Sequence, residues 1–85
     1  MTLNTGEITA LRFMFNGTRI GGRHCGLREI QRGFPTHERG NVEGYLRKLV
    51  KLGLVIPHPT HYGTQYSINP RMIHEVKENL FSTED

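Results

Sequence analysis

The chain has 85 residues, and we expect it to form one small domain. A chain of this length buries about 60% of the surface that its unfolded form exposes, so the core is thin and an enzyme with a large active site is not expected. Eleven Lys and Arg residues against eight Asp and Glu give a formal net charge of +3. This excess permits an anionic partner without requiring one.

The single cysteine excludes an internal disulfide and a zinc site made of several cysteines. A lone thiol fits a reducing compartment, no apolar run reaches the roughly 20 residues of a membrane span, and no signal-peptide pattern opens the sequence. We therefore expect a cytoplasmic protein with no membrane contact.

His24-Cys25 and His58-x-x-His61 are too sparse for a zinc site, and no base or pocket is visible for a catalytic cysteine. We expect no cofactor, no metal and no catalytic residue.

The first helix is predicted at about residues 5–16. Asn4 is placed as the N-cap, and Glu7, three residues later, completes a capping box. Gly17 is predicted at the C′ position that ends the helix. Phe13 lies off the apolar stripe, which consists of Ile8, Leu11, Met14 and Phe15.

A glycine-rich basic connector over residues 17–26 leads into a second, short helix at about residues 26–32. The connector lacks the lysine and hydroxyl residue of a phosphate-binding loop, so we interpret it as a solvated connector. We expect Phe34 to be buried, and Pro35 prevents the helix from continuing. A turn follows over residues 36–40.

The strongest helical periodicity spans residues 41–52, with Asn41 as the predicted N-cap and Gly53 at the predicted C′ position. One face of this helix is apolar and carries Val42, Tyr45, Leu46, Leu49 and Leu52. The opposite face carries Glu43, Gly44, Arg47, Lys48 and Lys51.

A β-hairpin is predicted at about residues 54–68. The apolar run 54–56 forms its first strand, Pro57 and Pro59 are expected to end that strand, and residues 64–68 alternate as the returning strand. This leaves a long tip over residues 57–63. A last helix is predicted at about residues 70–80, with Asn69 as the N-cap and Pro70 at the first helical position.

This order of elements predicts an α+β fold that is mainly α. The stretch Val42-x-x-x-Leu46-x-x-Leu49-x-x-x-Gly53-Leu54-Val55 resembles the winged helix-turn-helix transcriptional regulators of the MarR and ArsR kind. In those families the recognition helix ends with Gly-Leu-Val and leads directly into the wing. The resemblance covers about residues 25–68, although the interval from Ile30 to Val42 is about one residue longer than usual. It implies a three-helix core, a hairpin wing and a C-terminal helix.

The resemblance also implies a DNA-binding protein whose helix 41–52 enters the major groove. Residues 12–51 hold nine Lys and Arg against three Glu (+6), whereas residues 52–85 hold two against four acidic residues (−2). Gly44 would let the helix backbone approach DNA closely, and Glu43 either accepts from a cytosine amino group or repels phosphates. The predicted DNA-binding residues are Arg39, Asn41, Glu43, Gly44, Arg47, Lys48, Lys51, Thr60, His61 and Tyr62.

Two partner questions stay open at this stage. Phe13 lies off its stripe, and the last helix carries more apolar residues than a thin core needs, which predicts a homodimer through the first and last helices. The competing interpretation is that Phe13 and Phe81 pack together within one chain. No sensor segment for a small-molecule effector is evident. Alternatives to DNA binding are a winged-helix protein-interaction module, then an RNA- or ribosome-associated domain, and last an enzyme.

Overall fold

The computed structural model describes residues 2–81. These residues form a mainly helical α+β domain, so the predicted fold class is confirmed at this level. The elements in chain order are α1 (Thr5–Asn16), β1 (Cys25–Gly26), α2 (Leu27–Gln31), the 3-10 helix η1 (Thr36–Asn41), α3 (Val42–Lys51), β2 (Val55–Thr60), β3 (Gly63–Ile68), the 3-10 helix η2 (Pro70–Met72) and α4 (Ile73–Phe81).

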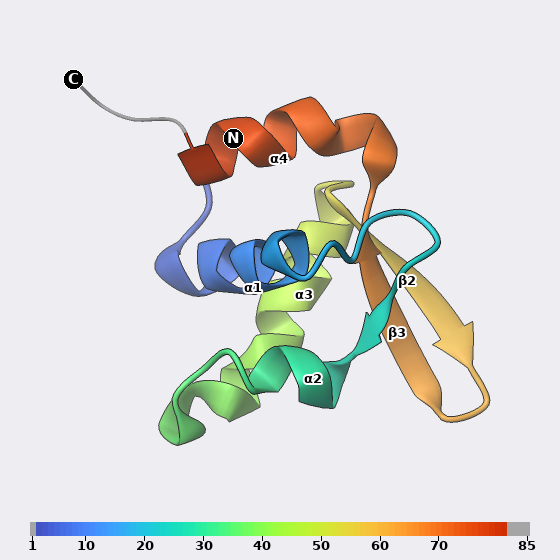
Figure 1. Cartoon of the computed structure of the whole chain (residues 1–85). Helices are drawn as coiled ribbons and strands as arrows, with labels where there is room; N and C mark the ends of the chain where they lie inside the picture. Colours follow the sequence, from blue (N-terminus) through green and yellow to red (C-terminus); the bar gives the residue numbers. More distant parts are fainter. Residues whose placement is uncertain (1, 82–85) are drawn as a thin grey trace.

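The helices pack around α1, with α4 on one side of it and α2 on the other (Figure 1). α3 crosses α1, and the β2–β3 hairpin projects from one side of this helical body. The three strands form one antiparallel sheet in the order β1-β3-β2, which leaves β2 at an edge. α3 and the hairpin are therefore neighbours in space as well as in sequence.

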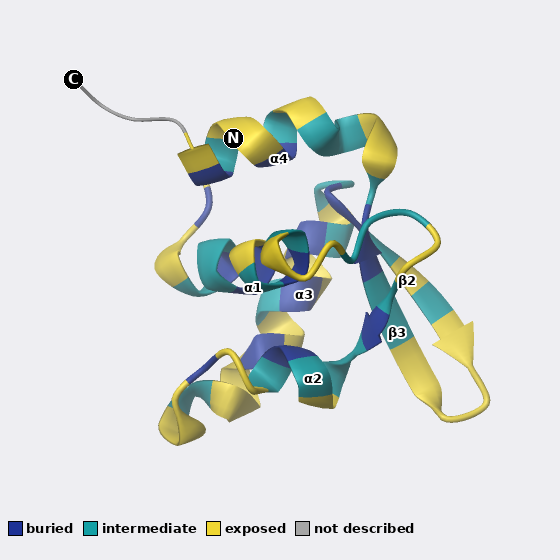
Figure 2. Ribbon diagram, viewed as in Figure 1, coloured by how far each residue is buried: buried dark blue, intermediate teal, exposed yellow. Residues whose placement is uncertain are grey.

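The core lies where α1, α3 and the base of the hairpin meet, and Figure 2 shows the buried positions on the facing sides of these elements. Every apolar side chain that is fully inaccessible contributes to this one cluster. The prediction that Phe34 is buried is confirmed. The buried apolar residues are Leu3, Ala10, Leu11, Met14, Cys25, Ile30, Phe34, Val42, Leu46, Leu49, Leu54, Val55, Ile68, Val76 and Leu80.

Both ends of α1 are capped, but the second cap differs from the prediction. The capping box is confirmed, since the Glu7 amide donates to Asn4 Oδ1 at 2.7 Å and the Asn4 amide donates to Glu7 Oε1 at 2.9 Å. At the other end, the left-handed residue is Thr18, with a φ of 53°, rather than Gly17. The placement of Gly17 was wrong by one residue because the helix stays wound through Gly17, whose amide still bonds to the Phe13 carbonyl.

The N-terminus of α3 also departs from the prediction. Asn41 immediately precedes α3, as predicted for its N-cap, but it has helical backbone angles and its side chain makes no capping hydrogen bond. The reason is that η1 runs directly into α3, and the Val42 amide already bonds to the Arg39 carbonyl. At the other end, Gly53 takes a φ of 81° and closes the helix, and the Leu54 amide bonds to the Leu49 carbonyl, which confirms the predicted C′ glycine.

The short strand β1 was not predicted. Cys25 pairs with Tyr66 across the sheet and is buried, so the end of the connector forms a strand directly before α2. Two residues carry too little pattern for a strand to be detected in the sequence. A further bridge joins Ile20, in the connector, to Ile68.

The hairpin is tighter than predicted. β2 runs through Pro57 and Pro59 to Thr60, and Thr60 pairs with Gly63 across a two-residue turn, so the predicted long tip was wrong. An edge strand bonds to its single neighbour through alternate residues only. Two prolines spaced two residues apart can therefore both occupy positions that need no N–H donor. Gly63 takes a φ of 120°, which a residue with a side chain rarely adopts.

The start of the last helix follows the prediction, while its apolar contacts do not. Asn69 Oδ1 accepts from the Arg71 amide at 3.0 Å and Pro70 begins the helical turn, as expected. The aromatic partner of Phe81 is Phe15, at 5.3 Å between ring centroids, and not Phe13. Phe13 instead packs over Gly33, where an added Cβ would lie 2.6 Å from the Phe13 ring. The premise that Phe13 is an exposed dimer contact was therefore wrong.

Two histidines tie the connector before β1 to the outer side of the hairpin. The rings of His24 and His58 stack with centroids 4.4 Å apart. His24 Nδ1 lies 2.6 Å from Gln65 Oε1, and His58 Nε2 lies 2.8 Å from Ser67 Oγ. Burial, followed by the neighbouring His24, lowers the pKa of His58. The folded protein therefore favours a neutral His58.

We expect this pair to make the protein less stable in mild acid. In the unfolded chain His58 has a pKa near 6.5, so the unfolded state takes up the proton first. The His58 contribution is complete above about pH 6.5 and is lost as the pH falls below that value. Thermal unfolding between about pH 7.5 and about pH 5.5 should show this loss in the wild type, and the loss should be smaller in His58→Gln. His37→Gln, at an exposed site on η1 where the described residues give it no ion pair, is the matched control and should keep the wild-type slope. Parallel curves for the wild type and His58→Gln would contradict the assignment.

Candidate nucleic-acid interface

All ten residues predicted to bind DNA are exposed. Six of them lie on α3 or at its start, because burial of Val42, Leu46 and Leu49 turns the opposite side of that helix to solvent. The ten do not, however, all face the same way. The helical repeat divides the exposed part of α3 into an edge toward the hairpin, a central strip and an edge toward α1.

The edge toward the hairpin carries Glu43, Arg47 and Val50, which line one shallow cleft of about 230 Å³ together with Pro57, Thr64 and Tyr66. Burial raises the pKa of Tyr66, the Glu43 carboxylate raises it further, and Arg47 opposes this effect. Tyr66 lines the same cleft as both charged residues, which accounts for these effects. The side of β3 that carries Thr64 and Tyr66 therefore lines the same cleft as this edge of α3.

The central strip and the edge toward α1 hold the remaining cations. Gly44 and Lys51 lie on the central strip, and an added Cβ at Gly44 would meet nothing within 4 Å. Lys48 is turned toward the N-terminus of α1, where its Nζ is 3.9 Å from Glu7 Oε2. Glu7 is buried, so the Lys48 ammonium group offsets the charge of its carboxylate. Lys48 also lies at the border of the exposed face of α3.

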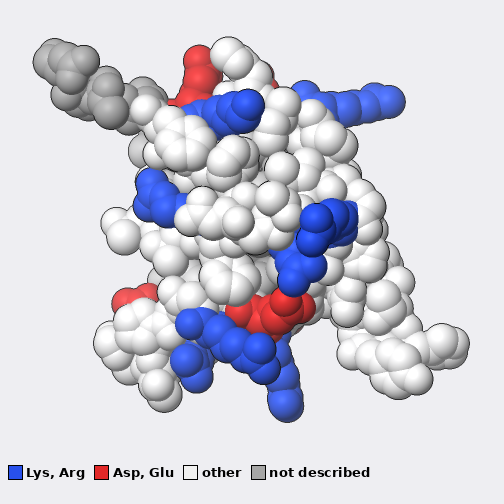
Figure 3. All heavy atoms as spheres, in the orientation of Figure 1, with Lys and Arg blue, Asp and Glu red and all other residues white. Residues whose placement is uncertain are grey.

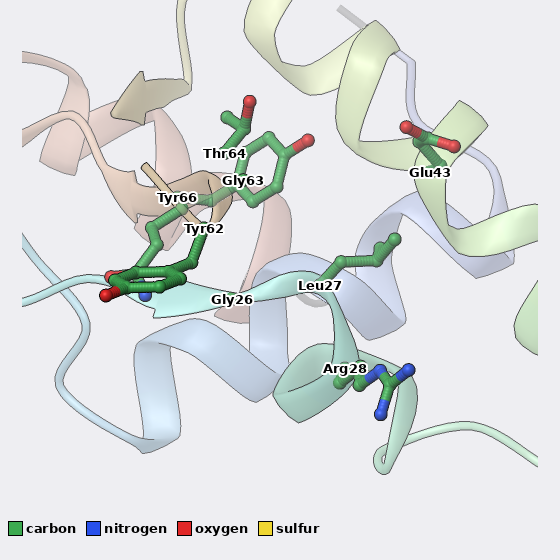
Figure 4. Close-up of a pocket in the computed structure, with 9 residues that line it drawn as sticks. Gly26, Leu27, Arg28, Glu43, Tyr62, Gly63, Thr64 and Tyr66 are labelled. Carbon is green, nitrogen blue, oxygen red and sulfur yellow. The ribbon is translucent and has the colours of Figure 1, made fainter. Parts of the chain in front are cut away.

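A larger cleft of about 430 Å³ separates the hairpin from the helices (Figure 4). Its helical wall is formed by Gly26, Leu27 and Arg28 at the start of α2 and by Glu43 in the first turn of α3. Its opposite wall is the hairpin segment 62–66. The structure thus brings Glu43 and Tyr62 to one cleft, although they are far apart in the sequence.

The hairpin tip is held by its own hydrogen bonds. Thr60 Oγ1 accepts from the Tyr62 amide at 3.2 Å and donates to the Gly63 carbonyl. This leaves His61 and Tyr62 as the outward side chains, and Tyr62 is 100% exposed. The tip therefore presents the Tyr62 ring and the His61 imidazole to solvent. The Thr60 hydroxyl is occupied by hydrogen bonds within the turn.

Cationic side chains surround α2 and avoid the hairpin. Figure 3 shows several Lys and Arg side chains over the α2 region, others spread over the rest of the helical body, and none over the hairpin in the same view. Arg28 and Arg32 are exposed there, whereas Arg19 is paired with Glu29 at 2.9 Å. Arg39 donates through Nε to the Phe34 carbonyl at 3.2 Å, so it braces the segment between α2 and α3.

Sequence reasoning missed Arg28 and Tyr66 as residues of this surface. Arg28 follows Leu27 in a helix with one buried position at Ile30, so its exposure could be predicted, but the hairpin wall opposite it could not. Tyr66 looked like an alternating strand residue, and its contact with α3 depends on the sheet register, in which it pairs with Cys25 and Pro57.

Other chemistry has little support within residues 2–81. No three His, Cys, Asp or Glu side chains come together there in the way that a metal site needs. Burial, followed by Glu29, raises the pKa of the Cys25 thiol to about 11, so the thiol is protonated at neutral pH and is a weak nucleophile. None of the helices formed by these residues has the length and hydrophobicity of a membrane span.

Comparison with protein-family models, curated proteins and solved structures found no match to this chain.

Proposed function

We propose that this domain is a winged helix-turn-helix that binds double-stranded DNA, with α3 in the major groove and the β2–β3 hairpin as the wing. The order α1, β1, α2, α3, β2, β3 and the sheet order β1-β3-β2 support this assignment. Gly53 and Leu54 lead from α3 directly into β2, as the sequence resemblance implies. In this proposal the protein acts in the cytoplasm as a transcriptional regulator.

One observation carries the proposal. The first turn of α3, at Glu43, and the hairpin segment 62–66 border the same open cleft, so a rod of nucleic acid lying on α3 would also meet the hairpin. A helix that enters the major groove needs one apolar side that packs in the core and one polar side that faces DNA. α3 has both, since its apolar side is buried and Arg47, Lys48 and Lys51 are exposed. Arg28 and Arg32 extend the positive charge along α2, where backbone phosphates would pass.

The proposed roles differ between helix and wing. Arg47 and Lys51 reach into the groove, and Gly44 allows the helix backbone to approach it. Arg39 and Asn41 lie beside the N-terminus of α3, and Lys48 flanks it on the α1 side. The hairpin carries no Lys or Arg, so His61, Tyr62 and backbone amides would position the protein on the sugar-phosphate backbone without reading bases.

The proposal still includes a homodimer, but Phe13 no longer supports it. Phe81 is 56% exposed, and it packs on Phe15 at the surface shared by α1 and α4. A two-fold axis through this surface would place two copies of α3 on successive turns of DNA. Sedimentation equilibrium at micromolar concentration checks it. A species of 9.8 kDa that is unchanged by Phe81→Ser would remove the dimer from the proposal.

The second candidate function is a protein-interaction module without nucleic-acid affinity. The fully exposed Tyr62 at the hairpin tip favours it, since exposed tyrosines are enriched at protein interfaces.

Binding to fluorescent duplexes of mixed sequence at two salt concentrations separates the two functions. A domain that contacts about four phosphates should lose on the order of 100-fold in affinity between about 50 mM and about 200 mM salt. A matched single strand and an acidic peptide serve as controls for charge alone. Absence of duplex binding at the lower salt concentration would favour the interaction module.

A further inference from the structure

The most informative residue in the proposed interface is its one acid. Glu43 is exposed in the first turn of α3 and lines both clefts between that helix and the hairpin. A surface that served only to follow the phosphate backbone would be uniformly positive, and a carboxylate at its centre would weaken binding to every sequence. The position of Glu43 therefore calls for a separate explanation.

Glu43 and Arg47 form a row of opposite charges on one edge of α3. They are four residues apart, which places them on successive turns of the same edge. Within residues 2–81 neither side chain takes part in an ion pair, so the two charges do not neutralise each other. The adjoining phenol of Tyr66 and the turn at Gly63 leave a cleft of about 430 Å³ open beside Glu43.

The major groove presents the pattern that such a row would match. Guanine offers two acceptors, which suit an arginine, and cytosine offers an amino donor, which suits a carboxylate. Four residues of helix advance by about 6 Å, which is close to two base-pair steps of about 3.4 Å each. Gly44, with open space at its Cβ position, lets this end of α3 sit deep enough for Glu43 to reach a base edge.

We infer that Glu43 is a specificity-determining residue that accepts a hydrogen bond from a cytosine amino group, while Arg47 reads a guanine about two base-pair steps away. This inference rests on the proposed DNA-binding function and adds to it a sequence preference. The preferred duplex contains a C·G pair and a G·C pair at this spacing. Glu43 lowers affinity for other sequences and so contributes to discrimination more than to total binding.

A competing explanation is purely structural. An acid in the first turn of a helix interacts favourably with the helix dipole, and α3 has no side-chain N-cap to supply this stabilisation. Glu75 also lies in the first turn of its helix, α4, away from the proposed interface. Glu75→Gln is therefore the matched control for the same loss of charge at a helix start.

The test selects preferred duplexes from a pool with a randomised centre, using the wild type, Glu43→Gln and Glu75→Gln. The wild type and Glu75→Gln should enrich the same site, with a cytosine at one position. Glu43→Gln should lose the preference at that position and keep the others. In direct binding, replacing that cytosine should weaken the wild type by about 5-fold to 150-fold and leave Glu43→Gln within about 2-fold.

Two results would overturn the inference, and they are distinguishable. If Glu43→Gln binds all duplexes more tightly by a common factor with its preferences unchanged, Glu43 only repels phosphates and the DNA-binding function stands. If the wild type binds no duplex at low salt, the proposed function itself fails. Circular dichroism of all three proteins confirms that the comparison is made between folded domains.

Discussion

Replacing Gly6 by alanine is expected to lower the free energy of unfolding by about 1–3 kcal/mol, the usual range for a core contact that is overfilled. The α-carbon of Gly6 faces the ring of Tyr45, and an added Cβ would lie 2.2 Å from the ring Cζ atom. The ring is held in place by its stacking on Phe34 at 5.8 Å and by its hydroxyl, which donates to Glu38 at 3.2 Å. Alanine can therefore be accommodated only by moving Tyr45 away from both partners.

Chemical denaturation checks this expectation, and two further variants isolate its cause. Gly44→Ala is the matched control, because it also lies in a helix but its Cβ position is open, so it should stabilise the domain by about 0.5–1 kcal/mol. In a Tyr45→Ala background, Gly6→Ala should lose most of its effect, as residues in direct contact are not additive. An unchanged effect in that background would show that the Tyr45 ring is not the cause.

Gly44→Ala has a second use, since stability and binding should change in opposite directions. The variant should be more stable, but the added methyl group lies on the central strip of α3 that the proposed function places in the groove. If the proposed function holds, Gly44→Ala should therefore bind duplex DNA more weakly than the wild type in the same binding titrations, although its Cβ meets nothing within the protein.

The elements that could be predicted from the sequence are those specified by local chemistry. The capping box at Asn4, the C′ glycine at Gly53 and the Asn69-Pro70 helix start each depend on residues within one turn of each other. The apolar stripe of α3 is similarly local, which explains why its buried face at Val42, Leu46 and Leu49 matched the expectation.

The errors arise where a distant partner decides the structure. β1 exists because Cys25 and Gly26 pair with β3, forty residues along the chain, and two residues have no periodicity of their own. Pro57 and Pro59 do not end β2, because it is an edge strand, and edge position follows from the sheet order. The capping bond expected of Asn41 is absent because η1 runs directly into α3, and no local signal in the sequence indicates that continuation.

The same distinction applies to the candidate site. The exposure of Arg47, Lys51 and Glu43 followed from the helical repeat, and the structure agrees. The cleft between α3 and the hairpin, and the place of Tyr66 and Arg28 in its walls, depend on how the hairpin lies against the helices. The direction of Lys48 toward Glu7 likewise could not be predicted from the sequence, because it depends on where α1 packs. The neighbours of each exposed residue are therefore set by tertiary packing and not by the local sequence.

The double variant Arg47→Ala, Lys51→Ala is expected to reduce duplex affinity by about 2–4 kcal/mol, or on the order of 30-fold to 1,000-fold. Arg47 would lose a guanine contact, which is worth about 1–3 kcal/mol, and Lys51, whose side chain enters the same groove, would lose its contact with a phosphate at the groove edge. The loss of the phosphate contact should also make the salt dependence of binding shallower by about one counterion. Binding titrations of the proteins at two salt concentrations measure both effects.

The control must remove the same charge from a different surface, and the chain offers one. Arg71 on η2 and Lys77 on α4 are exposed at the α4 end of the molecule, away from α2 and η1 (Figure 1). Arg71→Ala, Lys77→Ala lowers the net charge equally but should change affinity by only a few fold, through long-range attraction alone. Both double variants replace solvated side chains, so neither should change the stability by more than about 1 kcal/mol. If the two double variants weaken binding to the same extent, net charge accounts for the affinity and α3 is not the element that enters the groove.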